Sequence, residues 1–137
     1  MFIQRQWFLG TITPRLLNFK FQGMNTKEVQ KGSLIDYKLR LRGIPIHWRS
    51  SIDNWSPPAY FVDNQVRGPY KVWHHRHLLI ELKKGTLMKD VIFYRLPLQP
   101  LTELGIRGIV DHDVQEIFQY RFQMLNKILA SMEIQDQ

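Results

Sequence analysis

The clearest pattern in the sequence is an alternation of apolar and charged residues that begins soon after Gly32. In GSLIDYKLRLRG, residues 32–43, every second side chain is apolar or aromatic and most of those between are charged. A period of two places alternate side chains on opposite faces of a β-strand. We therefore expect a half-buried strand of an antiparallel sheet. The expected core positions are Ile35, Tyr37, Leu39 and Leu41.

The next sixty residues contain four more segments that have the length and composition of strands. They are IPIHWRSSIDNW (44–55), AYFVDNQVR (59–67), KVWHHRHLLIEL (71–82) and TLMKDVIFYRL (86–96). The prolines and glycines between them are turn signals. The first segment should form a hairpin with residues 32–43 across Gly43. Pro45 should then face solvent or lie at an edge, because proline cannot donate to a strand ladder.

Beyond residue 100 the apolar residues recur at helical spacing. A long helix is expected to begin at Asp111 or Asp113, either of which can cap it, and to run to about Met132. Leu101–Val110 is expected to be a separate short helix. The apolar stripe of the long helix is Val114, Ile117, Phe118, Leu125, Ile128, Leu129 and Met132. This order predicts a single α+β domain over residues 1–137, in which a curved antiparallel sheet wraps around the C-terminal helix.

Composition narrows the class of protein. A chain of 137 residues can bury roughly two thirds of its unfolded surface, so one core is expected. The absence of cysteine excludes disulfides, thiolate metal sites and a cysteine nucleophile, and it fits a cytoplasmic location. No stretch approaches about 18 consecutive apolar residues, so no transmembrane segment is expected. The N-terminal MFIQRQWFLGTITP does not have the form of a signal peptide.

The net charge of +7 and the pI near 9.9 favour loose attraction to polyanions. The basic residues are spread along the chain and often alternate with apolar ones, as on the wet face of a sheet. We therefore expect no specific nucleic-acid site. The oligomeric state is left open by the sequence.

Three of the five histidines lie in one expected strand, in VWHHRHLL (72–79). By alternation His75 and His77 share a face with Trp73, whereas His74 points to the other face. The cluster is therefore a pair and an outlier.

The next strand brings a carboxylate to this pair. If residues 83–84 form a two-residue loop, Asp90 lies opposite His77. If residues 84–85 form the loop, Asp90 lies diagonal to His77 instead. Both registers make a histidine and a carboxylate neighbours. The first register also pairs His75 with Ile92 and Trp73 with Tyr94.

Four interpretations of this cluster remain open. A metal site would need a third group to converge with the two histidines, and nothing beyond Asp90 marks one, so no metal and no cofactor are expected. Acid–base catalysis would use His77 with its pKa tuned by Asp90. Otherwise the polar groups line a pocket and orient a ligand, or they are purely structural. The remaining polar candidates are expected on the outer face or exposed: His47, Arg49, His74 and His112.

Five short motifs within residues 9 to about 125 resemble one subgroup of bacterial proteins. They are W-x-P-P, F-V-D, G-P-Y, W-x-H-x-H and G-T-x-M-x-D. The subgroup belongs to the SRPBCC ligand-binding domains, the START-like helix-grip superfamily, which includes polyketide cyclase/dehydrase and coenzyme Q-binding proteins. The resemblance implies a sheet of about seven strands that grips the C-terminal helix, with a hydrophobic pocket between them.

A pocket of this kind implies binding or carriage of a lipid, polyketide or isoprenoid. Combined with the alternation, it would be lined by Tyr37, Leu39, Trp48, Trp73, His75, His77, Met88, Asp90, Ile92, Tyr94, Phe118 and Phe122. One alternative is a cyclase or dehydratase in which His77 moves a proton and Asp90 orients it. Another is an accessory protein, since similar domains occur fused to sugar-nucleotide epimerase-like domains.

The N-terminal segment differs from the pattern of the SRPBCC domains. Relatives usually begin with a strand, a long helix and a second short helix before the segment similar to LGTITPRLLNFKF, whereas only Met1 to Phe8 precede it here. Either FIQRQWF is the first strand and the first helix is shortened or missing, or translation starts within the usual domain.

Overall fold

Residues 13–135 are described by the structure, which is a computed structural model. They form six strands and two α-helices, with a short 3-10 helix, η2 (Arg15–Leu17), at the beginning. The strands are β1 (Lys20–Met24), β2 (Leu34–Leu41), β3 (Ile44–Ser56), β4 (Tyr60–Arg67), β5 (Val72–Leu82) and β6 (Gly85–Arg95). The helices are α2 (Leu101–Gly105) and α3 (Arg107–Gln135). The segment FIQRQWF, with its expected strand, lies outside the described residues.

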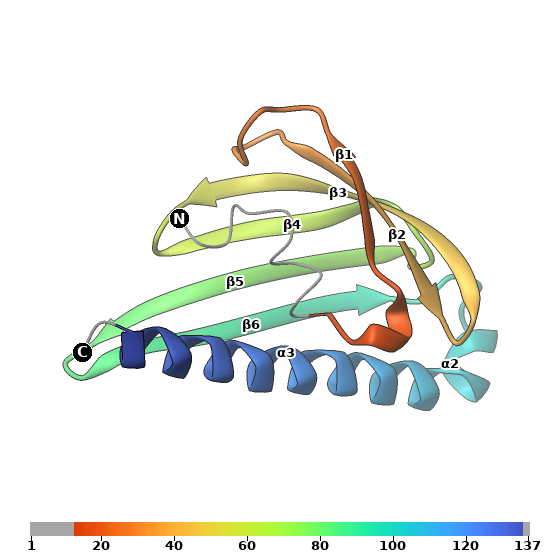
Figure 1. Cartoon of the computed structure of the whole chain (residues 1–137). Helices are drawn as coiled ribbons and strands as arrows, with labels where there is room; N and C mark the ends of the chain where they lie inside the picture. The colour runs from red at the N-terminus through yellow and green to blue at the C-terminus, as the bar shows by residue number, and fades with distance from the viewer. Residues whose placement is uncertain (1–12, 136–137) are drawn as a thin grey trace.

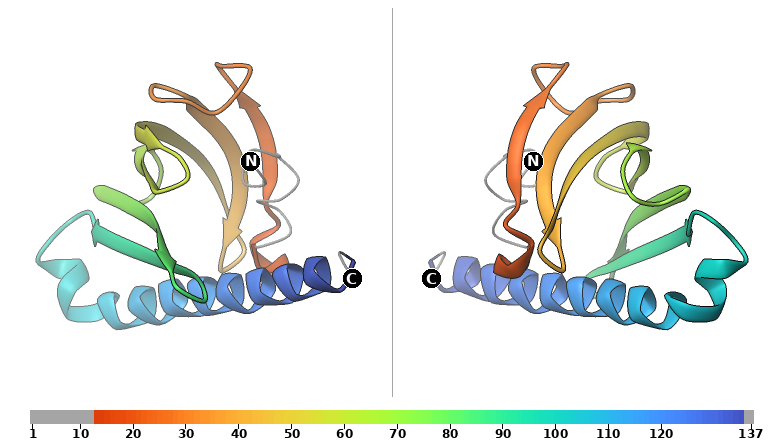
Figure 2. Two further views of the ribbon diagram at one scale, coloured as in Figure 1. Left: turned by 90° about the vertical axis from the view of Figure 1, so that its left-hand side faces the viewer. Right: turned by 90° about the vertical axis from the view of Figure 1, so that its right-hand side faces the viewer.

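The six strands form one antiparallel sheet in the order of the chain, β1-β2-β3-β4-β5-β6. The sheet is strongly curved and α3 runs beneath it (Figure 1). Seen along both sides, the sheet forms an arch above the helix (Figure 2). The α+β fold with a curved antiparallel sheet around a long C-terminal helix is thus confirmed. Within residues 13–135, no helix is long and apolar enough to cross a membrane.

The five strands predicted from alternation are present as β2 to β6. In β2 the expected inner side chains Ile35 and Leu39 are buried, while Lys38 and Arg40 are exposed. Leu41 pairs with Ile44 at the start of β3, which confirms the predicted hairpin. Its two turn residues, Arg42 and Gly43, have φ angles of 49° and 81°, as a type I′ turn requires. Pro45 is exposed, as expected.

The register between β5 and β6 is the one predicted for a loop of residues 83–84. Leu82 pairs with Gly85, and the pairing continues without a shift along both strands. His77 therefore lies opposite Asp90, as expected. The neighbouring pairs are also those predicted, His75 with Ile92 and Trp73 with Tyr94.

The predicted start of the long helix was wrong. The helix α3 begins at Arg107, directly after Ile106, which is the C-cap residue of α2. Asp111 and Asp113 lie within α3 and use their carboxylates elsewhere: Asp111 accepts a hydrogen bond from Tyr94 on β6, and Asp113 binds Arg42 of the β2–β3 turn at 2.7 and 2.8 Å. Both contacts attach the beginning of α3 to the sheet.

The predicted apolar stripe of α3 is only partly covered. Val114 is buried at 8% exposure, and Ile117, Phe118, Leu125 and Ile128 are half-buried. Leu129 is 56% exposed, so the expectation that it belongs to the covered stripe was wrong. The side chain of Met132 lies outside the described part. Among the described residues, the apolar side chains buried most deeply are Ile35, Leu39, Trp48, Ile52, Phe61, Val62, Leu96 and Val114.

Ile52 on β3 offers a test of where the core lies. Its side chain is buried at 3% exposure on the concave face, so Ile52→Ala should lower the free energy of unfolding by about 2 kcal/mol, the lower end of the range for such substitutions. The lower end is expected because Ile52 borders a cavity. Urea denaturation measures the loss. Ile44→Ala is the control, since Ile44 is 63% exposed and should change stability by only about 0.5 kcal/mol. Equal losses for the two variants would contradict this placement.

Candidate functional site

A cavity of about 220 Å³ lies between the concave face of the sheet and α3. Its wall is mostly apolar and aromatic. Nine of the twelve residues predicted to line a pocket do line it: Tyr37, Leu39, Trp48, Trp73, His75, His77, Met88, Asp90 and Phe118. They come from β2, β3, β5, β6 and α3, so the alternation correctly identified the inner face of each strand.

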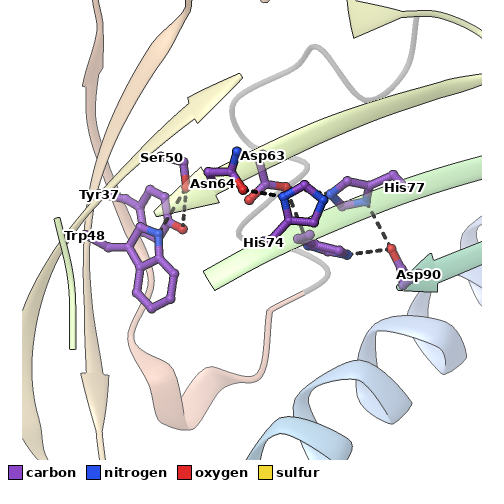
Figure 3. Close-up of polar contacts among 9 residues, drawn as sticks. Tyr37, Trp48, Ser50, Asp63, Asn64, His74, His77 and Asp90 are labelled. Carbon is purple, nitrogen blue, oxygen red and sulfur yellow. Dashed lines mark hydrogen bonds and ion pairs between the residues drawn. The ribbon is translucent and has the colours of Figure 1, made fainter. Parts of the chain in front are cut away.

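Aromatic rings form one side of the cavity. Trp48 lies between Tyr37 and Trp73, with ring centroids 6.0 and 5.4 Å away. Trp73 continues the row to Phe118 on α3, at 6.5 Å. The indole N–H of Trp48 donates to Ser50 Oγ at 3.0 Å, so its polar atom is satisfied within the wall (Figure 3). This side of the cavity therefore offers rigid apolar contact area with few free polar groups.

Four ionisable side chains meet on β4, β5 and β6 beside this aromatic row, where the His75 ring centroid lies 6.5 Å from that of Trp73 and 5.1 Å from that of Phe118. His75 has its Nε2 2.8 Å from Asp90 Oδ1 and its Nδ1 3.5 Å from Asp63 Oδ2. His77 has its Nε2 2.7 Å from Asp63 Oδ2 and its Nδ1 3.0 Å from Asp90 Oδ1. Figure 3 shows Asp63 and Asp90 on either side of His77. We call these four residues the His–Asp cluster.

Stacking fixes the orientation of the histidine rings. The ring of His77 lies against Phe61, with centroids 3.9 Å apart and an interplanar angle of 13°. The His75 and His77 centroids are 3.6 Å apart, and the edge of Phe118 approaches His75 at 5.1 Å. The cluster is thus held between the sheet and α3, and His75 is only 3% exposed.

The pKa values in the cluster follow from burial and from these contacts. Burial raises the pKa of Asp63 and Asp90, but the hydrogen bonds and charges of the histidines outweigh it, so both carboxyls have a pKa below the usual value. Burial lowers the pKa of His77, yet its hydrogen bonds to the two carboxylates raise it above the usual value. For His75 burial dominates and the pKa is lowered. At pH values between these two pKa values His77 therefore carries the positive charge and His75 is neutral.

Arg121 on α3 supplies a second positive charge to the cavity. Its guanidinium carbon lies 4.8 Å from the centroid of the Phe118 ring. Its charge helps to lower the pKa of Asp63. The Nε atom is buried and has no hydrogen-bond partner among the described residues. Arg121 is therefore positioned to bind a polar group that enters the cavity.

Three of the twelve predicted pocket residues do not line the cavity. Ile92 and Tyr94 lie on the expected face of β6 and are half-buried, but the Tyr94 hydroxyl is engaged with α3. Phe122 is 58% exposed. The helix turns Phe118, Arg121 and Leu125 inward, and Phe122 lies beside this row. The position we assigned to Phe122 was therefore wrong.

Sequence reasoning missed two charged residues of the candidate site, Asp63 and Arg121. Asp63 alternates with Phe61 and belongs to the F-V-D motif, so its face could have been identified from the strand period. Its position opposite His75 depends on the β4–β5 register, which the pattern did not determine. Arg121 lies three residues after Phe118 at helical spacing, but charged residues of an amphipathic helix are predicted to face solvent.

The other polar candidates lie where they were expected. His74 points to the outer face, where its Nδ1 is 2.7 Å from Asn64 Oδ1 (Figure 3). His47 and Arg49 are exposed on β3, and Arg49 pairs with Asp36. His112 is exposed as well, although it lies within α3 and not beside a cap.

Comparison with known proteins identifies the fold only. No protein-family model matches the sequence, and no curated protein matches it. The structure is similar to the crystal structure of TTHA0849 from Thermus thermophilus, with a TM-score of 0.64. The similarity covers 90% of this chain and 84% of that chain at 15% sequence identity. At this identity the likeness shows a shared fold and no more.

The pKa of His77 provides a test of the cluster. In protein freed of metal ions with EDTA, the folded pKa lies above the unfolded value of about 6.5, so the protonated ring stabilises the fold. This stabilisation is full below pH 6.5 and is lost as pH rises through the folded pKa. Asp63→Asn removes one carboxylate partner, so the pKa of His77 should fall, by about 1 unit or more. NMR titration of the ring carbons measures it.

Asp53→Asn is the matched control for this titration. Asp53 is an exposed carboxylate on the neighbouring strand β3, where it bonds to Ser51 and Asn64 and not to His77. The control variant should leave the His77 titration as in the wild type. An equal change in both variants would show that Asp63 has no special effect on His77.

Proposed function

We propose that the protein binds a small hydrophobic ligand of lipid, polyketide or isoprenoid type in the cavity between the sheet and α3. The observation that carries this proposal is a cavity whose wall joins a row of aromatic rings to a cluster of charged side chains. The resemblance of the sequence motifs to SRPBCC domains supports the same function. We further propose a cytoplasmic location, in keeping with the absence of cysteine.

The aromatic row and the charged side chains suit two parts of one ligand. Burial of apolar ligand surface against Trp48, Trp73 and Phe118 supplies the favourable free energy. The free Nε–H of Arg121 can bind a carbonyl, hydroxyl or carboxylate of the ligand. A polar group placed there also satisfies a buried donor, which increases affinity for ligands that carry one. Drug-sized pockets measure about 300–1,000 Å³, so this cavity fits ligands at or below that range.

A second candidate function is proton transfer on the bound ligand, as in a cyclase or dehydratase. The observation that favours it is the contact of His77 with both Asp63 and Asp90, at 2.7 and 3.0 Å. These carboxylates orient the ring and stabilise its protonated form, the arrangement expected for a general acid. In this reaction one N–H of His77 would turn from its carboxylate to the ligand, donate its proton to a carbonyl or hydroxyl oxygen there, and recover a proton from solvent or product.

Native mass spectrometry of protein from its own host tests ligand binding. We expect an adduct that organic extraction identifies as an apolar molecule. Leu125→Trp should lower its occupancy and weaken binding of a fluorescent fatty acid about tenfold, or roughly 1.4 kcal/mol, because the larger side chain fills the cavity. Leu129→Trp is the matched control, one turn further along α3 and 56% exposed. A wild-type protein that carries no adduct and binds no apolar probe would refute the proposal.

The extracted compound also tests proton transfer. His77→Ala should slow its conversion while the compound still binds, because the aromatic wall of the cavity is intact. General acid–base contributions are typically 10²–10⁴-fold, so the turnover number should fall by about that factor with little change in dissociation constant. Product formation followed by chromatography gives the turnover. Unchanged turnover in His77→Ala would exclude His77 as the acid and leave the binding function alone.

A further inference from the structure

Three ligand atoms of the His–Asp cluster converge on one point. Asp63, His75 and His77 each offer one such atom, and these atoms all lie within 4.8 Å of one another. His75 Nδ1 and His77 Nε2 lie 3.5 and 2.7 Å from the same oxygen, Asp63 Oδ2. Zinc holds histidine and carboxylate ligands at about 2.0–2.2 Å, so neighbouring ligand atoms of a tetrahedral site lie roughly 3.4 Å apart. Small rotations of these side chains would bring all three atoms to that spacing.

Asp90 contacts the other nitrogen of each histidine. Its Oδ1 lies 2.8 Å from His75 Nε2 and 3.0 Å from His77 Nδ1. Histidines that bind a metal almost always donate their second ring N–H to a carboxylate, a carbonyl or water, which selects the tautomer with a free lone pair toward the metal. A single carboxylate is placed here to select that tautomer in both rings at once.

The number of protons in the cluster makes the position beside Asp63 favourable for a cation. Each neutral imidazole has one N–H, so two neutral rings can satisfy only two of the four contacts between nitrogen and carboxylate. When both N–H groups point to Asp90, two nitrogen lone pairs face the carboxylate of Asp63, which is repulsive. A proton on His77 relieves one of these two contacts. A divalent ion at the same position relieves both.

We propose that Asp63, His75 and His77 bind a divalent first-row transition ion such as Zn²⁺, with Asp90 orienting the two histidines. Two imidazoles and one carboxylate are a ligand set that such ions accept, and three protein ligands leave a coordination position open. The three residues line the cavity, so this position is accessible to water or to an oxygen of a ligand. The proposal goes beyond the sequence prediction of no metal site, because Asp63 was not recognised there.

Metal titration of the full chain, with any histidine tag removed and after EDTA treatment, tests the site. Calorimetry with Zn²⁺ should give one ion per chain. Co²⁺ should add visible absorption bands typical of nitrogen and oxygen ligands in a site of low coordination number. Asp90→Asn should weaken Zn²⁺ binding about 10–100-fold, since Asp90 acts through the histidines. Asp63→Asn and His77→Ala each remove a ligand and should weaken binding by more than Asp90→Asn does.

His74→Ala is the matched control, because His74 lies on the same strand but points to the outer face. It should bind Zn²⁺ as the wild type does. Circular dichroism reports whether each variant is folded, and the nearly isosteric Asp63→Asn provides the test if His77→Ala does not fold. The proposal is overturned if the wild type binds neither ion at one per chain, or if Asp63→Asn binds as tightly as the wild type.

The metal site and the hydrophobic ligand can fail separately. Metal titration is made without any apolar ligand, and binding of the fluorescent fatty acid is measured in EDTA-treated protein. Probe binding without metal binding would leave only the hydrophobic cavity. Metal binding without probe binding would leave only the site of Asp63, His75 and His77.

Discussion

Mutual neutralisation of charges within a mostly apolar cavity is the constraint on which this structure depends. An unpaired buried charge costs several kcal/mol, so Asp63 and Asp90 can remain ionised only because His75 and His77 lie beside them. Each charged member of the cluster lowers the free-energy cost of burying the others. The same balance makes the site responsive, because a proton, a metal ion or a polar ligand group that enters the cavity changes the charge seen by every member.

Strand pairing is what assembles the cluster. Asp63 lies opposite His75 on β4 and β5, and His77 lies opposite Asp90 on β5 and β6. A shift of one residue in either pairing would turn a carboxylate to the outer face. The uninterrupted pairing of β5 with β6 and the two-residue turn at 83–84 leave little freedom for such a shift. The rigidity of this hairpin therefore serves the site as well as the sheet.

The helix α3 closes the cavity without filling it. Its polar attachments to the sheet, Arg42 with Asp113 and Tyr94 with Asp111, lie in its first part. Further along, Leu125 borders the cavity and Leu129 is exposed. Apolar surface that borders a cavity makes fewer contacts with protein atoms than packed surface does, and it contributes less to stability. A ligand bound in the cavity would raise the stability of the folded state by mass action. Incomplete packing between the sheet and α3 therefore favours binding.

Alternation along the chain determined the strands and their inner faces, and it made Asp90 a neighbour of His77 in both registers that the turn allowed, because side-chain direction in a strand depends on local geometry. It could not place Asp63 beside His75, since that contact depends on the β4–β5 register across a longer connection. The start of α3 was also beyond local rules: Asp111 and Asp113 look like caps, but they bind Tyr94 and Arg42 from the sheet. The inward position of Arg121 is likewise a tertiary result, because it depends on the ring of Phe118 and on the charge of Asp63 from another element of the fold. The sequence by itself thus determined the fold and half of the charged cluster, and the tertiary structure decided which charges meet.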